Sequence, residues 1–139
     1  MYREFWAIAL KRMRGTHPGW TRARTTDSSW TDASLGVPGV VVSTAWFRGD
    51  LTVQLYFNAE DEEENNRQYG KLLSWRAEFE SALSGLPVWD PMEGRKAARV
   101  YLASSSARIE DRETWDQAID WAIDAQARIR EAFTASGTS

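Results

Sequence analysis

Two adjacent segments, residues 40–47 and 51–58, constrain the fold of this chain more than any others. The first, VVVSTAWF, consists largely of β-branched and aromatic residues, which are enriched in strands. The second, LTVQLYFN, alternates apolar and polar side chains, which gives a strand one apolar face. Gly49 and Asp50 stand between the two segments and suit a tight turn. The pattern predicts an antiparallel hairpin that packs one face on a core.

Helical periodicity flanks this hairpin on both sides. A helix is expected over residues 2–14, ending at Gly15, because its apolar residues repeat at i, i+3, i+4, i+7, i+8 and i+11. These residues are Tyr2, Phe5, Trp6, Ala9, Leu10 and Met13. Similar stripes predict a long helix over residues 61–84 and another over about 110–133. The four carboxylates at 61–64 suit the start of the second helix, where the helix dipole is positive.

Two further strands complete the predicted order of elements. Residues 29–35 suit a short strand, and RKAARVYLAS at 95–104 suits a strand with small and apolar residues on one face. The order is therefore α–β–β–β–α–β–α. We expect one α+β domain over residues 1–139, with two layers: a mostly antiparallel sheet of three to four strands, and helices on one face. Residues 134–139 are expected to form a frayed tail.

The composition excludes several classes of site. The chain has 139 residues, no cysteine and one histidine, so disulfides, thiolate metal sites, cysteine nucleophiles and multi-histidine metal sites are ruled out. No apolar run approaches the ~20 residues of a membrane span, and no signal peptide is visible. We expect a cytoplasmic protein without a membrane contact, a cofactor or a bound metal.

The motifs that carry catalysis are also missing from the sequence. There is no phosphate-binding glycine loop and no nucleophile elbow, and His17 lies in a Pro-Gly loop. Asp90, Glu93 and Lys96 resemble part of a metal-dependent nuclease site, but one residue too many separates Glu93 from Lys96 for the usual arrangement on one strand face. A turn that leads into a basic strand explains this segment better. The sequence therefore favours a non-enzymatic role and offers no catalytic residue.

Charge is distributed unevenly along the chain. Residues 1–48 carry seven basic and three acidic side chains, whereas residues 49–93 carry three basic and ten acidic ones. Such asymmetry marks a partner surface or two oppositely charged elements that lie side by side. The acidic total favours a protein partner over a nucleic acid, because nucleic-acid-binding domains are usually basic.

The eight tryptophans are the other unusual feature of the composition. Trp6, Trp75 and Trp115 fall on helix stripes and are expected in the core. Trp20 and Trp30, together with Trp89, fall in loops or at strand edges and are candidates for a surface. Tryptophan beside arginine suits both nucleic acids and protein hot spots. The candidate binding residues are Trp20, Arg22, Arg24, Trp30, Arg48, Trp89, Arg95, Lys96 and Arg99.

Five segments together resemble a known family. They are YREFWAIAL, SSWTDASLGVPGVVVS, LTVQLYFNAEDEEENNRQYGKL, VWDPMEGRKAARVYL and EDRETWDQAIDWAI. In order and spacing the chain is similar to the domain-of-unknown-function 4268 family of prokaryotes, often found at the C-terminal end of restriction-endonuclease-like proteins. The resemblance implies a role beside DNA, in restriction or defence, and supplies no catalytic residues. The resemblance covers most of the given sequence, so we expect any nuclease partner to be a separate protein.

Three hypotheses follow from these observations. In the first, the chain is a non-enzymatic binding or accessory domain associated with restriction or defence against foreign DNA, with a separate nuclease, another protein or DNA as its partner. In the second, it is a protein–protein or self-association module that contacts no nucleic acid. In the third, it is a hydrolase that uses Asp90, Glu93 and Lys96. Joint exposure of the three surface tryptophans beside the arginines would define one binding face.

Overall fold

The hairpin over residues 40–58 forms the centre of the sheet in a computed structural model, which describes residues 1–136. Its strands pair antiparallel from Val40 opposite Phe57 to Phe47 opposite Asp50. The two turn residues are Arg48 and Gly49, one position earlier than predicted, with φ of 52° and 86°. Two-residue hairpin turns need this left-handed conformation to match the twist of the strands. Glycine adopts it readily, whereas it costs energy at Arg48.

Five strands and four α-helices make up the described part of the chain. The elements are α1 (Tyr2–Thr16), β1 (Trp30–Ser34), β2 (Val40–Phe47), β3 (Asp50–Phe57), α2 (Glu62–Ser74), α3 (Arg76–Leu83), β4 (Val88–Asp90), β5 (Ala98–Ser104), the 3-10 turn η1 (Arg112–Thr114) and α4 (Trp115–Ala135). The α+β class and the predicted order of elements are confirmed, with β4 and a divided second helix as additions.

The sheet has the strand order β1-β2-β3-β5-β4, and every neighbouring pair is antiparallel. The prediction of three to four strands was too low, because β4 was taken as part of a loop. With three residues, β4 is too short to show a period of two, and Pro91 directly follows it. Its strand conformation comes from pairing with β5, which is a contact that local sequence does not reveal.

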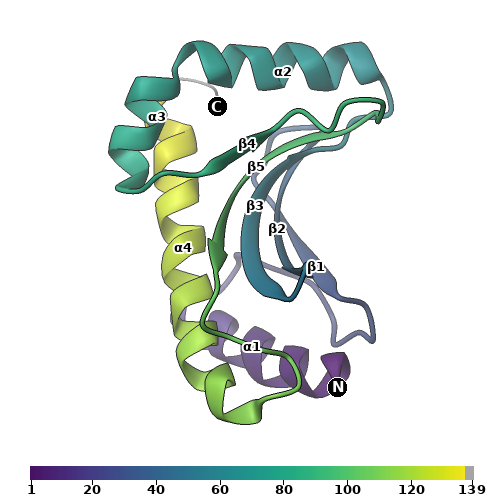
Figure 1. Cartoon of the computed structure of the whole chain (residues 1–139), viewed down its shortest axis with the longest axis vertical. Helices are drawn as coiled ribbons and strands as arrows, with labels where there is room; N and C mark the ends of the chain where they lie inside the picture. The colour runs from purple at the N-terminus through teal and green to yellow at the C-terminus, as the bar shows by residue number, and fades with distance from the viewer. Residues whose placement is uncertain (137–139) are drawn as a thin grey trace.

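Helices cover one face of this sheet, as predicted. The sheet is curved, α4 runs along its convex side, and α1 and α2 lie toward its two ends (Figure 1). The alternating apolar residues of β3 point to the helices and are fully buried, as Leu51, Val53 and Leu55 illustrate at 0% exposure. The period of two therefore determines which face receives the core.

Helix α1 packs through the predicted stripe and runs through Gly15 to Thr16. Phe5 meets the rings of Trp6, Trp46 and Trp115 edge to face, with centroids 5.0–5.3 Å apart. The buried indole Nε1 of Trp6 donates to the Ser28 carbonyl at 2.8 Å. This cluster joins α1, β2 and α4 in one core.

The predicted helix over 61–84 is two helices that meet at Trp75, and this is a correction. The Ser74 hydroxyl donates to the Lys71 carbonyl at 2.6 Å, and the Trp75 N–H donates to Leu72 instead of Lys71. A serine that bonds back to the helix in this way bends it. The break lets α3 lie against α4 while α2 crosses the end of the sheet (Figure 1).

The break also overturns the expected place of one tryptophan. Trp6 and Trp115 are buried, as predicted, but the side chain of Trp75 lies at the junction and is 45% exposed. The helical stripe that included Trp75 assumed an unbroken period of 3.6, and the junction ends that period. At the C-terminus, where the sequence predicts a frayed tail over residues 134–139, α4 reaches Ala135 and Ser136 is buried. Residues 137–139 of that tail lie outside the described residues.

Candidate functional site

The face of the sheet opposite the core carries polar and aromatic side chains, and we call it the open face. It consists of the alternate residues of each strand, as the register shows: Asp32 opposes Ser43, Ser43 opposes Gln54, and Gln54 opposes Tyr101. Gln54 is only 3% exposed, because the concave sheet and its large side chains enclose it. The sequence pattern identified the outward strand positions but not this degree of enclosure.

A hollow of about 440 Å³ lies on the open face. One side is formed by Trp30 and Asp32 of β1, and the other by Phe47, Tyr56 and Arg99 of strands β2, β3 and β5. The full lining comprises Ser29, Trp30, Asp32, Ser43, Ala45, Trp46, Phe47, Gln54, Tyr56, Asn58 and Arg99. Mixed aromatic and polar linings of this size are typical of small-ligand sites.

Arg99 is held in place by three neighbours on the open face. Its guanidinium carbon lies 4.2 Å from the ring centre of Phe47 and 5.3 Å from that of Tyr101. Its Nε donates to Asp90 Oδ2 at 2.9 Å. Its two terminal nitrogens have no hydrogen-bond partner among residues 1–136. A fixed guanidinium with both terminal nitrogens unused is a bidentate site for a carboxylate or a phosphate.

Gln54 presents an acceptor to the same hollow. The Thr52 hydroxyl donates to the Ala45 carbonyl at 2.8 Å, so its oxygen accepts from Gln54 Nε2 at 3.0 Å. This chain of donors assigns the orientation of the amide. The carbonyl Oε1 of Gln54 therefore remains, and it has no hydrogen-bond partner in the described part of the chain.

Asp32 supplies the second acceptor of the hollow. The protein around this carboxylate displaces enough water to raise its pKa above the ordinary value, and the Ser43 hydroxyl opposes that shift by hydrogen bonding. Asp32 has no ion-pair partner among the described residues. Arg99 and Asp32 thus place opposite charges on opposite sides of one hollow.

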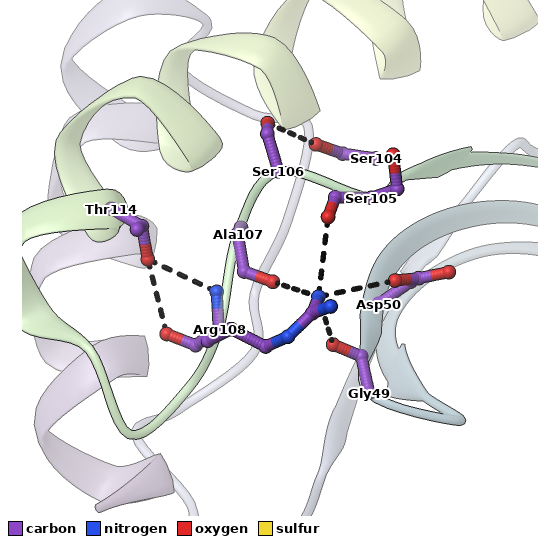
Figure 2. A network of polar contacts seen from close by, with 8 residues as sticks. All are labelled: Gly49, Asp50, Ser104, Ser105, Ser106, Ala107, Arg108 and Thr114. Carbon is purple, nitrogen blue, oxygen red and sulfur yellow. Dashed lines mark hydrogen bonds and ion pairs between the residues drawn. The ribbon is translucent and has the colours of Figure 1, made fainter.

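A polar network secures the end of the sheet that carries Phe47 (Figure 2). Arg108 Nη1 donates to the carbonyls of Ala107 at 2.9 Å and Ser105 at 3.2 Å, and contacts Gly49 O and Asp50 Oδ1 at 3.4 Å each. The Thr114 hydroxyl in turn bonds both the N–H and the carbonyl of Arg108. Arg108 therefore joins the turn after Phe47 to the segment between β5 and α4.

The structure separates the nine predicted binding residues. Trp30 and Arg99 line the hollow on the open face, whereas Trp20 and Arg22 line another hollow of about 470 Å³, which shares Asp32 with the first. The Trp20 ring stacks on His17 at 3.6 Å, and the Arg130 guanidinium carbon lies 4.7 Å from its centre. The ring of Trp20 is therefore engaged by side chains of the protein itself.

Trp89 lies on the helix-covered side of the sheet, so the three tryptophans do not form one patch. Its Nε1 donates to Glu80 Oε2 at 2.9 Å, and its ring meets those of Tyr69 and Phe79. The physical reason is that β4 is a strand, and Trp89 opposes the buried Val100. The remaining predicted cations Arg24, Arg48, Arg95 and Lys96 are exposed, and only Arg48 adjoins the site, 4.9 Å from the Phe47 ring centre.

The suspected nuclease residues do not converge either. Asp90 accepts from Arg99 and from the Met92 N–H at 2.9 Å, which stabilises the turn. Glu93 and Lys96 are exposed in the following loop. Within residues 1–136, no group of three His, Cys, Asp or Glu side chains is arranged to hold a metal ion.

Sequence reasoning missed Asp32, Ser43, Gln54, Phe47 and Tyr56 as site residues. A signal for Gln54 and Tyr56 was present, because the alternation in residues 51–58 assigned them to the face away from the core. Only the pairing of β2, β3 and β5 brings them near Arg99.

Comparison with known proteins agrees with the resemblance noted in the sequence. The family model described as domain of unknown function (DUF4268) matches residues 1–136. The chain belongs to the DUF4268 family. No curated protein and no solved structure matches it. In this DUF4268 chain, no helix among the described residues is both long and apolar enough to cross a membrane.

Proposed function

We propose that this DUF4268 domain is a non-enzymatic binding module whose ligand occupies the hollow on the open face. The observation that carries this function is that Arg99 and Gln54 are held in place by their neighbours, while the terminal nitrogens of Arg99 and Oε1 of Gln54 have no hydrogen-bond partner in the described chain. These atoms are not fully buried, so solvent reaches them. A ligand that bonds Arg99 and the carbonyl of Gln54 would replace that solvent at groups already in position.

The biological setting that we propose is accessory to restriction or defence against foreign DNA, in the cytoplasm of a prokaryote. The family resemblance supports this setting, and the separate partner would be a nuclease or another protein. Within this setting the domain recognises a ligand or positions a complex, and the chemistry belongs to the partner.

Protein-observed NMR of the tryptophan indole N–H groups and thermal shift, both with a broad fragment library, test the binding function. We expect several fragments to move the Trp30 indole resonance and to raise the melting temperature. The same fragments should not bind the variant Arg99→Ala, because it lacks the guanidinium group that would hold them. Fragments that bind only elsewhere, with an unchanged Trp30 resonance, would contradict a ligand site on the open face.

A second candidate function, self-association, is favoured by a different observation. The edge strand β4 and the helix junction beside it expose Trp75 at 45%, Leu86 at 85% and Val88 at 48%. Exposed apolar side chains near an unpaired strand edge suit pairing with a second copy of the chain. Light scattering at rising concentration tests this role. A dimer that Val88→Lys converts to a monomer supports it, and a strict monomer rejects it.

A further inference from the structure

The size and shape of the hollow restrict what it can hold. Its volume of about 440 Å³ lies near the lower end of the ~300–1,000 Å³ of small-ligand sites. The hollow is bounded by an exposed ring on one side and by a cation on the other. This arrangement fits one planar group that carries an anion, and it is too small for a folded partner.

Trp30 provides the planar surface. Its side chain is 51% exposed, and its ring makes no ring contact or hydrogen bond with any other described residue. An aromatic ring exposed on a sheet is a stacking platform for nucleobases. Trp30 lies opposite Ala45, so a small side chain leaves room beside the indole.

The other side of the hollow attracts an anion. The guanidinium carbons of Arg48 and Arg99 lie 4.9 Å and 4.2 Å from the centre of the same Phe47 ring. Asp90 pairs with Arg99, whereas Arg48 has no ion-pair partner in the described chain. On this side of the hollow two guanidinium groups and one carboxylate leave an excess of positive charge, whereas the carboxylate of Asp32 lies on the opposite side. A phosphate would balance it and would use both terminal nitrogens of Arg99.

Two acceptors in the hollow are open to a ligand. Gln54 Oε1 has no hydrogen-bond partner in the described chain, and the carboxylate of Asp32, on the Trp30 side, meets only the Ser43 hydroxyl. Donors of Ser29, Tyr56 and Asn58 also line the hollow, but the two acceptors suit a base edge with adjacent N–H donors. Guanine has such an edge, with its ring N–H beside an amino group, whereas uracil and thymine have a single ring N–H.

We infer that the ligand of the open face is a nucleotide unit, and this inference rests on the binding function proposed above. The base stacks on Trp30 with its N–H edge toward Asp32 and Gln54, and the phosphate is bound by Arg99. Guanine is the preferred base. The unit comes either from a free nucleotide or from a nucleotide within a single strand, because both present the same base and phosphate.

Isothermal titration calorimetry with the full chain separates these two sources. The probes are guanosine monophosphate, uridine monophosphate, inorganic phosphate, and single-stranded oligonucleotides of five thymines with or without a guanine in place of the central base. Binding of the mononucleotide supports a free nucleotide as ligand, and binding of the guanine oligonucleotide alone supports a single strand. In either case the guanine probe should bind more tightly than its pyrimidine counterpart.

Three variants identify the site of binding. Trp30→Ala should weaken the guanine probe roughly 5- to 100-fold, as loss of one stacked base does. Arg99→Lys keeps the charge but loses the planar fork, and should weaken binding about 10-fold. Trp75→Ala is the matched control, because it removes an exposed tryptophan away from the hollow, and it should leave affinity unchanged. Circular dichroism confirms that each variant is folded.

Several results would overturn the nucleotide inference. These are no binding of any guanine probe, phosphate alone binding as tightly as the nucleotide, equal affinity for guanine and pyrimidine probes, or equal loss in Trp30→Ala and Trp75→Ala. Fragments that still bind at Trp30 would preserve the binding function and reject only the nucleotide. Failure of both experiments would reject the binding function itself.

Discussion

The two faces of the sheet use alternate residues of the same strands, yet they are built by different rules. On the covered face Leu51, Val53 and Leu55 are fully buried against helices. On the open face Gln54 is almost as buried, but by neighbouring side chains and the curvature of the sheet instead of a helix. Burial on the first face is apolar and stabilises the fold. Burial on the second face is polar and leaves acceptors and donors unused, which is typical of a binding site.

Leu55 and Tyr56 provide the strongest test of this difference, because they are adjacent and point to opposite faces. Leu55→Ala should lower the free energy of unfolding by about 2–5 kcal/mol through lost burial and a cavity. Tyr56→Ala should lower it by about 1 kcal/mol or less, since Tyr56 is half-buried. Urea denaturation measures both values. Equal losses would show that the open face belongs to the core.

Arg99 tests whether the open face is organised for a ligand or for stability. Arg99→Ala removes the stacked stem and the partner of Asp90, so a loss of about 1–2 kcal/mol in unfolding free energy is expected. The affinity for the ligand should fall by a larger factor than the loss of folding stability can account for. Chemical denaturation and titration calorimetry on the same variant measure the two effects. A loss of stability above that of Leu55→Ala would assign Arg99 to structure.

Two tryptophans in the core against the covered face, Trp6 of α1 and Trp46 of β2, refine the comparison. Trp6 Nε1 donates to Ser28 O, whereas Trp46 Nε1 is buried without a hydrogen-bond partner in the described chain. Trp6→Phe should cost about 1 kcal/mol more than Trp46→Phe, because only the first substitution breaks a hydrogen bond. Thermal melting of both variants measures the difference. A larger cost for Trp46→Phe would indicate that its N–H has a partner in solution.

The pH dependence of stability gives the smallest expected effect. Burial raises the pKa of Asp32 in the folded state, so the folded protein binds that proton more tightly than the unfolded chain. The resulting stabilisation is present below the unfolded pKa, near pH 4, and is lost as pH rises through the folded value. Asp32→Asn should therefore gain stability over the parent chain between acid and neutral pH. Urea midpoints of the variant and the parent chain at pH 3.5 and 7 measure this effect. The same difference between the two proteins at both pH values would contradict it.

Local patterning determined the covered face from sequence alone. The alternation in residues 51–58 and the helical stripe with Phe5, Trp6 and Leu10 both predicted buried residues. A buried apolar face imposes the period of its own element on the sequence, so each element shows its inward side without reference to the others. The prediction that Trp75 is buried was wrong because a side-chain hydrogen bond from Ser74 ended the helical period just before it.

Which residues share the open face could be determined only from the tertiary structure. Trp30, Gln54 and Arg99 are far apart in sequence, and they meet only because β1, β2, β3 and β5 pair in one register on a curved sheet. Sequence named Trp30 and Arg99 as candidates by residue type, but it grouped them with Trp20 and Trp89, which the fold engages elsewhere. The chain alone thus determined the elements and their inward sides through periodicity. Strand pairing, which depends on long-range contacts, decided which outward side chains share a site.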